Sequence, residues 1–393
     1  MAACDVAVIG GGPVGLALAA CLQNTGLAIR ILDRQPEAAL ADPAFDGREI
    51  ALTHASQATL REIGAWELLP PEHISPLVEA RVLNGGSGYA LRFDTSGRPQ
   101  DTLGQLVSNH AIRRALFSRA LANPDVSLQA GTAIESLSTD VEGAEIRLAG
   151  GEVLRAGLVV AADSRFSSAR GWLRIGAERH DFGQRMMVVR LEHTAPHHGV
   201  ATEWFDYGQT IAMLPLQGRR SSAVITLPPA EMAALDTLPE EDFGPEIARR
   251  YRQRLGSMRQ VSTRHLYPLV TTYAERFSTT RAALLGDAAV GMHPVTAHGF
   301  NFGLRGAASL AGLIREAVST GQDFASPRLL RRYAAEHRQA TRPLFLATNA
   351  TALIYGQDTL PARLLRNAAL RLGNHLPGVR RKVVSGLMEA EGH

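Results

Sequence analysis

The sequence predicts an α/β fold that combines a domain built on a parallel β-sheet, a second domain rich in β-strands, and a helical segment at the end. Three observations predict it. An apolar strand, a glycine-rich turn and an apolar helix follow one another within residues 4–24. Short β-prone runs separated by polar turns dominate the middle of the chain. Residues 327–393 carry leucine and alanine at helical spacing among basic residues.

The composition is that of a soluble globular protein of two or three domains: 393 residues, of which 45% are hydrophobic and 20% charged. The 41 basic residues barely outnumber the 38 acidic ones, so the charge does not indicate a nucleic-acid partner. Cys4 and Cys21 lie in apolar segments, which favours buried thiols in a reducing compartment. No apolar run approaches the ~20 residues of a membrane span, and no secretion signal is evident, so a cytoplasmic protein is expected. The histidines lack metal-ligand spacing, and no metal is expected.

A strand–turn–helix–strand pattern at the start of the chain predicts a dinucleotide-binding unit. In the glycine turn, Gly10 permits a tight bend, Gly12 lets the backbone approach a pyrophosphate, and Gly15 lets the helix pack closely on the strand. The free N–H groups and the positive dipole end of the helix then face the phosphates. Asp33 and Arg34 follow the second strand, where a carboxylate accepts hydrogen bonds from ribose hydroxyls. The predicted elements are a strand over residues 4–9, a helix over 14–24 and a strand over 27–32.

Two later segments repeat the design of an apolar strand that ends in an acid and a turn. Residues 158–170 carry Asp163, and a second run carries Gly286 and Asp287. That second run continues into a glycine-punctuated loop over 293–303 and an apolar helix. Together with the N-terminal turn, these segments resemble the three fingerprints of the class A FAD-dependent aromatic hydroxylases, in the same order. The resemblance covers nearly the whole chain and implies FAD bound in a Rossmann-type domain.

The resemblance assigns roles around the flavin. Asp287 is expected to bond the ribityl or ribose part of FAD, and the loop from Pro294 to Gly299 to line the flavin ring. The following helix points its N-terminus at the pyrimidine end, where N–H groups and a positive dipole stabilise the negative charge of reduced flavin. Asp163 is expected in the cofactor region, although Asp163-Ser164 stands where the family has Asp-Gly, and a turn-forming role explains it as well. The cofactor-binding residues assigned in these segments are Asp163, Gly286, Asp287, Pro294, Gly299, Phe300 and Asn301.

Two further segments are similar to those of the ubiquinone-biosynthesis hydroxylases within this class. Residues 46–52 resemble the family's Arg-x-x-Ala-Leu segment near the flavin diphosphate, and residues 103–109 resemble its Leu-Gly-x-x-x-x-Asn segment. Arg48 fits a cofactor role because a guanidinium forks onto phosphate oxygens, and a solvated surface charge is the alternative. Asn109 is a cofactor-binding candidate that N-capping of a helix over 111–121 explains equally well.

The flavin loop departs from the family pattern. The tripeptide Ala297-His298-Gly299 stands where relatives have Gly-Gln-Gly, Val290 replaces a histidine, and Gly306 replaces an aspartate. This sub-pattern resembles a divergent branch of the family, named UbiM. His298 and Pro294 are the candidate catalytic residues, with the His298 imidazole touching the flavin or the substrate and titrating near neutral pH. The alternative for His298 is a loop histidine bonded to backbone.

The middle of the chain is expected to form a substrate domain. Its β-prone runs predict a sheet beneath the flavin, with a pocket between the sheet and the flavin. Trp204, Phe205 and Tyr207 are candidates to line that pocket, or else core residues of the sheet. The runs cover residues 186–191, 210–216 and 221–227, with a hairpin over 83–93. The predicted domains are an FAD-binding domain over 1–70, 98–175 and 265–326, a discontinuous β-sheet substrate domain over 71–97 and 176–264, and a C-terminal helical segment over 327–393.

The family resemblance implies an FAD-dependent monooxygenase that hydroxylates the ring of a polyprenyl phenol or quinol in ubiquinone biosynthesis through C4a-hydroperoxyflavin. The expected co-reactants are O₂ and NADPH, NADH or another electron donor. The basic C-terminal helices are expected to lie against anionic lipid at the inner membrane, to join a Ubi-type biosynthetic complex, or to be an ordinary solvated face. Two other classes stay open: an FAD oxidoreductase that inserts no oxygen, such as an isoprenoid reductase, and a flavin-binding scaffold without turnover.

Overall fold

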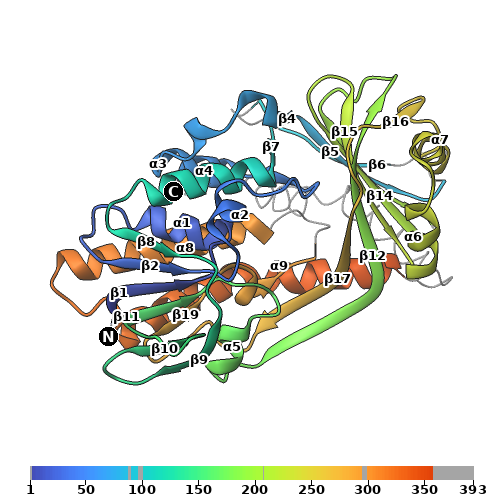
Figure 1. Ribbon diagram of the computed structural model, residues 1–393. Helices are drawn as coiled ribbons and strands as arrows, with labels where there is room; N and C mark the ends of the chain where they lie inside the picture. The colour runs from blue at the N-terminus through green and yellow to red at the C-terminus, as the bar shows by residue number, and fades with distance from the viewer. Residues whose placement is uncertain (1, 87–89, 96–100, 207, 294–298, 357–393) are drawn as a thin grey trace.

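The computed structural model describes residues 2–86, 90–95, 101–206, 208–293 and 299–356. Two lobes stand side by side in Figure 1, one around a mainly parallel sheet and the other around a larger, mainly antiparallel sheet. The long strands β12 (Ala177–His193) and β17 (His265–Ala274) run from one lobe to the other. The α/β fold with separate sheets and a C-terminal helix that the sequence predicts is confirmed.

The first lobe contains an eight-stranded sheet, six strands of which have the order β18-β19-β11-β1-β2-β8. The other two strands branch from β11: β10 pairs with β11, and β9 pairs with β10. The central strands β19, β11, β1, β2 and β8 are parallel, as expected for a unit in which helices connect successive strands. Val6 and Val8 on one face of β1 and Ala7 on the other are all fully buried, so both faces of the sheet are covered. The strands are β1 (Ala2–Ile9), β2 (Ile29–Leu32), β8 (Val126–Gln129), β9 (Ile134–Thr139), β10 (Ala144–Leu148), β11 (Val153–Ala161), β18 (Ser278–Thr279) and β19 (Ala282–Leu284).

Helix α1 (Pro13–Cys21) lies in this lobe in contact with α4 (Asn109–Leu121) and α8 (Gly299–Ser319). The helix begins directly after the glycine turn, as the sequence predicts, and Cys21 is buried at its end, whereas Cys4 is only half-buried. A small sheet of β3 (Glu49–Leu52), β7 (Gly104–Ser108) and β4 (Ile74–Leu77) joins the two lobes. The other helices of these parts are α2 (Glu37–Ala41), α3 (His54–Glu62) and α5 (Ser168–Trp172), with single 3-10 turns at Trp66–Leu68, Pro71–His73 and, as η3, Gly286–Ala288.

The second lobe is built on a nine-stranded sheet with the order β20-β17-β12-β15-β14-β13-β5-β6, and β16 pairs with β12. β17 pairs in this sheet along its length, although the sequence assigns residues 265–326 to the FAD-binding domain; the domain boundaries stay a prediction. The predicted hairpin over 83–93 corresponds to β5 and β6, which pair antiparallel. Besides β12 and β17, the strands are β5 (Glu79–Asn84), β6 (Ala90–Phe93), β13 (Val200–Asp206), β14 (Gln209–Pro215), β15 (Arg220–Leu227), β16 (Met258–Gln260) and β20 (Val290–Gly291).

One face of the nine-stranded sheet packs on helices α6 (Pro229–Asp236) and α7 (Glu240–Arg250). Because side chains alternate between the faces of a strand, this face takes every second residue of β12 to β15. Trp204 belongs to it: the ring is fully buried and its Nε1 donates to the Gly85 carbonyl at 3.0 Å. Trp204 is therefore a core residue rather than part of a pocket facing the other lobe. Phe205 points to the opposite face, and Tyr207 lies outside the described residues.

Helix α9 (Pro327–Gly356) packs along α8, the edge strand β18 and its neighbour β19. Tyr333 donates to the Leu284 carbonyl at 2.7 Å, and Thr341 lies within 3.0 Å of the Tyr273 hydroxyl. The prediction that residues 327–393 are helical is confirmed up to Gly356. Residues 357–393 lie outside the described residues. Within the described ranges, the structure has no helix long and apolar enough to cross a membrane.

The close approach of α7 to β16 depends on Gly244. A Cβ atom at Gly244 would lie 2.2 Å from the carbonyl oxygen of Met258, a backbone atom that cannot move aside cheaply. We expect Gly244→Ala to lower the free energy of unfolding by about 1–3 kcal/mol, as overpacking typically does. Gly312 in α8 is the matched control, because a Cβ there meets no atom within 4 Å. Gly312→Ala is expected to stabilise by about 0.5–1 kcal/mol through helix propensity, and urea unfolding that moved both variants in the same direction would contradict this account.

Candidate functional site

The glycine turn between β1 and α1 contains three glycines that are required for different reasons. A Cβ on Gly10 would lie 2.5 Å from the Ala162 carbonyl oxygen, and one on Gly15 would lie 2.1 Å from the Gly10 carbonyl oxygen. These two glycines are therefore fixed by packing within the protein. Gly12 is different, because its backbone (φ −72°, ψ 174°) suits any residue and a Cβ there would meet nothing within 4 Å.

The open space beside Gly12 lies at the N-cap of α1, where no side chain caps the helix. The first N–H groups of a helix lack intrahelical partners and attract anions. Neither the conformation nor the packing of the protein demands glycine at position 12, and the open space there leaves room for a group to approach the backbone. The turn thus fits the pyrophosphate of a dinucleotide.

Asp33 lies at the end of β2 and is tied to the same turn. Its Oδ2 accepts a hydrogen bond from the Gly11 N–H at 2.7 Å, and its Oδ1 accepts one from the Gln35 N–H at 2.7 Å. Each carboxylate oxygen has a second acceptor position, which fits a ribose hydroxyl. Arg34 is exposed next to it.

The second and third predicted segments meet at an ion pair between Arg165 and Asp287. The guanidinium donates to Asp287 Oδ2 from Nη2 at 2.8 Å and from Nε at 3.1 Å, and its Nη1 donates to the Val270 carbonyl at 2.8 Å. Gly286 adopts a positive φ of 58°, and its Cα faces Val14 at the start of α1. The structure therefore brings Asp287 beside the glycine turn and pairs it with an arginine that the sequence analysis did not single out.

Asp163 follows β11 and supports the start of α5. Its Oδ2 accepts hydrogen bonds from the Ser168 N–H at 3.0 Å and the Ala169 N–H at 3.4 Å, which is the turn-forming role. Its Oδ1 is buried without a hydrogen-bond partner among the described residues. A Cβ on Gly10 would lie 2.8 Å from the Asp163 Cα, so the residue also adjoins the glycine turn. A cofactor role for Asp163 stays a prediction.

Asn301 anchors the first turn of α8 to β3. The side chain is 1% exposed, its Nδ2 donates to the Ala51 carbonyl at 2.8 Å, and its Oδ1 accepts from the Thr53 N–H at 3.2 Å. Phe300 is buried beside it, and Gly299 begins the helix. These contacts fix the direction in which the α8 N-terminus points. Pro294 and His298, the two candidate catalytic residues, lie outside the described residues.

The loop that precedes β3 is held by Asp46. Its carboxylate pairs with Arg48 at 2.5 Å and accepts from Asn109 Nδ2 at 2.7 Å, and its carbonyl accepts from the Tyr267 hydroxyl at 2.6 Å. Burial acts to raise the pKa of Asp46, but the Arg48 guanidinium and the hydrogen bonds lower it below its ordinary value. Asn109 is the first residue of α4 and Ser108 its N-cap, so the Asn109 side chain holds the loop instead of capping the helix. Arg48 is likewise oriented by an ion pair rather than left as an isolated surface charge.

A second contact between the lobes joins Glu49 of β3 to Arg190 of β12. The Arg190 Nη2 lies 2.5 Å from Glu49 Oε1, and the Glu49 side chain is 1% exposed. Burial raises the pKa of Glu49 to about 7 even though the Arg190 guanidinium acts in the opposite direction. Arg190 also lies over the Phe45 ring, 4.5 Å from its centroid. Neither residue has a local sequence signal, because the pair is separated by 141 positions.

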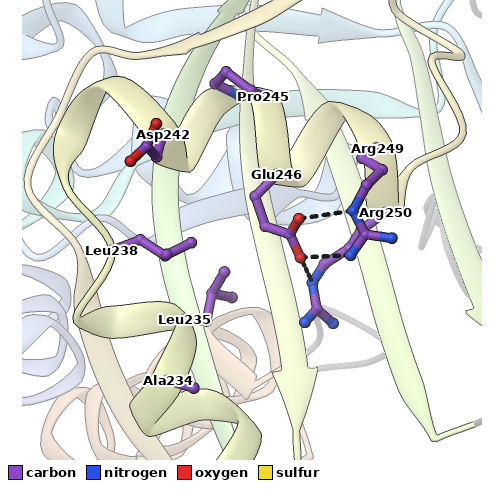
Figure 2. A pocket seen from close by; sticks show the side chains of 8 residues that line it. All are labelled: Ala234, Leu235, Leu238, Asp242, Pro245, Glu246, Arg249 and Arg250. Carbon is purple, nitrogen blue, oxygen red and sulfur yellow. Dashed lines mark hydrogen bonds and ion pairs between the residues drawn. The ribbon is translucent and has the colours of Figure 1, made fainter.

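A cavity of about 440 Å³ lies elsewhere, between α6 and α7 (Figure 2). Glu246 forms its polar wall by pairing with Arg249 and Arg250, both at 2.7 Å. None of the predicted site residues lines it, since it lies on the helix-covered side of the nine-stranded sheet. Among the described residues, no three His, Cys, Asp or Glu side chains gather as a metal site.

The chain is similar to known proteins along nearly its whole length. Residues 3–346 match the family model described as "FAD binding domain". The chain is 42% identical over 387 residues to the ubiquinone hydroxylase UbiM of Neisseria meningitidis, covering 98% of this chain and 84% of that protein. It is 36% identical to the ubiquinone hydroxylase UbiL of Rhodospirillum rubrum, covering 93% and 85%. The crystal structure of p-nitrophenol 4-monooxygenase from Pseudomonas putida has the same fold, with a TM-score of 0.79, 19% identity and full coverage of both chains.

The fold, the glycine turn and the matched family model define an FAD-binding flavoprotein. Asp33 and Asp287 lie beside that turn, so the acids that the sequence singles out converge on one edge of the parallel sheet. At a finer level, the chain belongs to the family of ubiquinone-biosynthesis flavin hydroxylases, in its UbiM branch.

Because the space at Gly12 is open, we predict that a variant with a larger side chain at this position folds normally but binds less flavin. Valine is sterically compatible with the backbone at position 12, but its methyl groups would occupy the space assigned to the pyrophosphate. We expect Gly12→Val to be folded and to carry less than about a tenth as much flavin as the unmodified protein, with Gly12→Ala intermediate. Flavin absorbance per protein and circular dichroism measure the two quantities. Full flavin content in folded Gly12→Val would show that the cofactor lies elsewhere.

Proposed function

We propose that this chain is an FAD-dependent monooxygenase that hydroxylates the aromatic ring of a polyprenyl phenol or quinol in ubiquinone biosynthesis. The observation that carries the proposal is the 42% identity to a ubiquinone hydroxylase over 98% of the chain. The open cradle at Gly12 supports it independently, because it fits the cofactor that such a reaction needs.

FAD, when bound, supplies the oxygen chemistry. The residues of the chain bind the cofactor, orient the substrate and keep water away from the site. The α1 N-terminus and Gly12 would hold the pyrophosphate, with Asp33 on a ribose and Asp287 on the ribityl or ribose part. Arg48, held by Asp46, would add positive charge near the diphosphate. The remaining cofactor residues of the proposal are Gly10, Gly15, Arg34, Asn109, Asp163, Gly286, Pro294, Gly299, Phe300 and Asn301.

The α8 N-terminus supports the redox part of the proposal. Asn301 fixes its direction through two backbone contacts, one on β3 and one at the N-cap residue of α3. A positive dipole end stabilises negative charge on a reduced ring system. O₂ would be the co-substrate, and NADPH, NADH or another electron donor the reductant. Water has to be kept away from the reacting oxygen, a task that belongs to the covering sheet and to the loop that contains Pro294 and His298.

A lipophilic substrate has consequences for the location of the enzyme in the cell. A polyprenyl chain partitions into a bilayer, so we propose that the enzyme works peripherally at the inner membrane or within a Ubi-type complex. Support comes from the exposed Arg328 and Arg331 at the start of α9, whereas Arg332 pairs with Glu336 at 2.9 Å and with Glu316 at 3.4 Å. Later in α9, Arg342 pairs with Glu178 at 2.8 Å and so is used internally.

Oxygen transfer is tested by isotope labelling. Purified enzyme given a short-chain 2-prenylphenol, a reductant and ¹⁸O₂ is expected to yield product with one ¹⁸O atom in the new hydroxyl. The product formed should equal the reductant consumed minus the hydrogen peroxide released, as mass spectrometry and a peroxide assay would measure. Label arriving from H₂¹⁸O instead, or reductant oxidation that does not respond to the phenol, would contradict the proposal and favour an FAD oxidoreductase that inserts no oxygen or a scaffold.

His298→Gln tests how the flavin loop contributes. Glutamine keeps hydrogen-bonding capacity and removes titration near neutral pH. We expect the variant to keep hydroxylating, with a changed ratio of product to hydrogen peroxide and a coupling that varies less between about pH 5 and 8. Loss of hydroxylation with normal flavin content and reduction would make His298 essential. An unchanged ratio and pH profile would show a loop histidine that faces away from the flavin.

A further inference from the structure

The nine-stranded sheet has a second face, opposite α6 and α7, that is turned toward the first lobe. Residues paired across neighbouring strands lie on the same face of a sheet. The pairing registers therefore place one row of side chains across this face, which we call the Glu203 row. Its members are Val82 of β5, Glu203 of β13, Ala212 of β14, Val224 of β15, Val188 of β12 and His265 of β17.

The two ends of the Glu203 row are covered by other parts of the molecule. At one end, a Cβ on Gly47 would lie 2.8 Å from His265 Cδ2 and 3.4 Å from Val188 Cβ, so the loop before β3 packs directly on the row. At the other end, Val82 belongs to an apolar cluster with Leu77 of β4 and Leu103. Glu203 stands between these two contacts, on the face turned toward the cofactor lobe, and it is half-buried.

Glu203 is a carboxyl group among apolar side chains. Val82 and Ala212 flank it across the sheet, and Ala201 and Phe205 lie two residues away on the same strand and face. Within the described part of the chain, its carboxyl group has neither a hydrogen bond nor an ion pair. Because the residue is half-buried and its carboxyl is not used inside the described protein, the group is available to a ligand that covers this face.

No charged side chain lies close to Glu203 on its face. The registers place the titratable groups Arg190, Glu192, Arg220, His265 and Tyr267 on this face. They belong to β12, β15 and β17, two to four strands from β13 in the sheet order, so their strands lie at least about 9 Å away. Arg81 on the neighbouring strand β5 and Asp206 on β13 itself are nearer to Glu203, but their side chains project from the opposite face of the sheet. Burial alone raises the pKa of Glu203 to about 8. At neutral pH the group is therefore mainly a neutral carboxylic acid, able to donate one hydrogen bond and to accept another.

We propose that Glu203 is a substrate-binding residue whose carboxyl group hydrogen-bonds an oxygen atom on the aromatic ring that the enzyme hydroxylates. The assignment rests on the proposed function. An aromatic ring with a prenyl tail is apolar apart from its ring oxygens, and one polar group in an apolar surface fixes the orientation of such a ligand. Val82, Phe205 and Ala212 would contact the ring, and Glu203 would select phenols over arenes without oxygen.

Two substitutions separate this role from a structural one. Glu203→Gln keeps a hydrogen-bond donor and an acceptor but does not titrate, whereas Glu203→Leu removes both. Asp206→Asn is the matched control, since it lies on the same strand but on the opposite face. The dissociation constant of the flavin-loaded enzyme for a short-chain 2-prenylphenol, followed by the change in flavin absorbance at pH 6.5, 7.5 and 9, is the primary measurement.

We expect Glu203→Leu to weaken binding about tenfold or more, because the ring oxygen would lose its partner. Glu203→Gln and Asp206→Asn should stay within about threefold of the unmodified enzyme. Binding to the unmodified enzyme should weaken as the pH rises through about 8, where Glu203 ionises. Binding to Glu203→Gln should stay constant until the phenol itself ionises near pH ~10.

Thermal unfolding supplies the second readout. A carboxyl whose pKa is raised by folding stabilises the folded state below its unfolded-state pKa, and that contribution is lost as the pH rises through about 8. The unmodified protein should therefore lose melting temperature between pH 6.5 and 9 relative to Glu203→Gln. Glu203→Leu should melt no lower than the unmodified protein at pH 7.5, because an unpartnered carboxyl has been removed.

Three results would overturn the assignment. Equal binding by Glu203→Leu and the unmodified enzyme would show that the carboxyl does not meet the ligand. Equal loss in Glu203→Gln and Glu203→Leu would show that an ionised carboxylate is required instead of a neutral acid. Failure of the unmodified, flavin-loaded enzyme to bind or hydroxylate the prenylphenol would overturn the proposed function, and the role of Glu203 with it.

Discussion

Close backbone approach at one edge of the parallel sheet is the constraint on which the rest of the structure depends. A Cβ at Gly10, Gly15 or Gly303 would lie 2.5, 2.1 or 2.5 Å from Ala162, Gly10 or Val14, respectively. These contacts press α1 onto β1 and α8 onto the start of α1. Two helix N-termini are thereby brought to the same edge, which is where dinucleotides bind in open parallel sheets.

A second set of contacts places the large sheet against that edge. The Glu49–Arg190 ion pair joins β3 to β12, and the hydrogen bond from the Tyr267 hydroxyl to the Asp46 carbonyl joins the loop before β3 to β17. The same loop carries Arg48 and is held by Asn109. The segment over residues 46–52, which the family resemblance places near the flavin diphosphate, thus also contains the residues that contact the second lobe.

The sequence predicts what depends on local pattern. Periodicity and glycine patterns extend over only a few residues, so they predict local elements. Examples are the turn from Gly10 to Gly15, the strands β14 and β15, and the helix that begins at Gly299. Tyr267 and Asp46 are 221 positions apart, and no local signal announces their contact. For the same reason, the sequence does not decide whether Trp204 lines a pocket or belongs to the core. Strand alternation fixes which residues share a face of the sheet, but only the packing of α6 and α7 decides which face is the core.

Glu49 and Glu203 show why burial alone does not identify a functional carboxyl. Burial raises the pKa of both, to about 7 and about 8. Glu49 has a guanidinium at 2.5 Å, so its burial is accounted for by a contact that joins two sheets. Glu203 has no such partner in the described structure, although leucine or valine would fit the strand pattern at its position equally well. A sequence that keeps a carboxyl without a partner between the apolar cross-strand neighbours Val82 and Ala212 departs from what stability alone favours, and such departures concentrate where a protein meets its ligand.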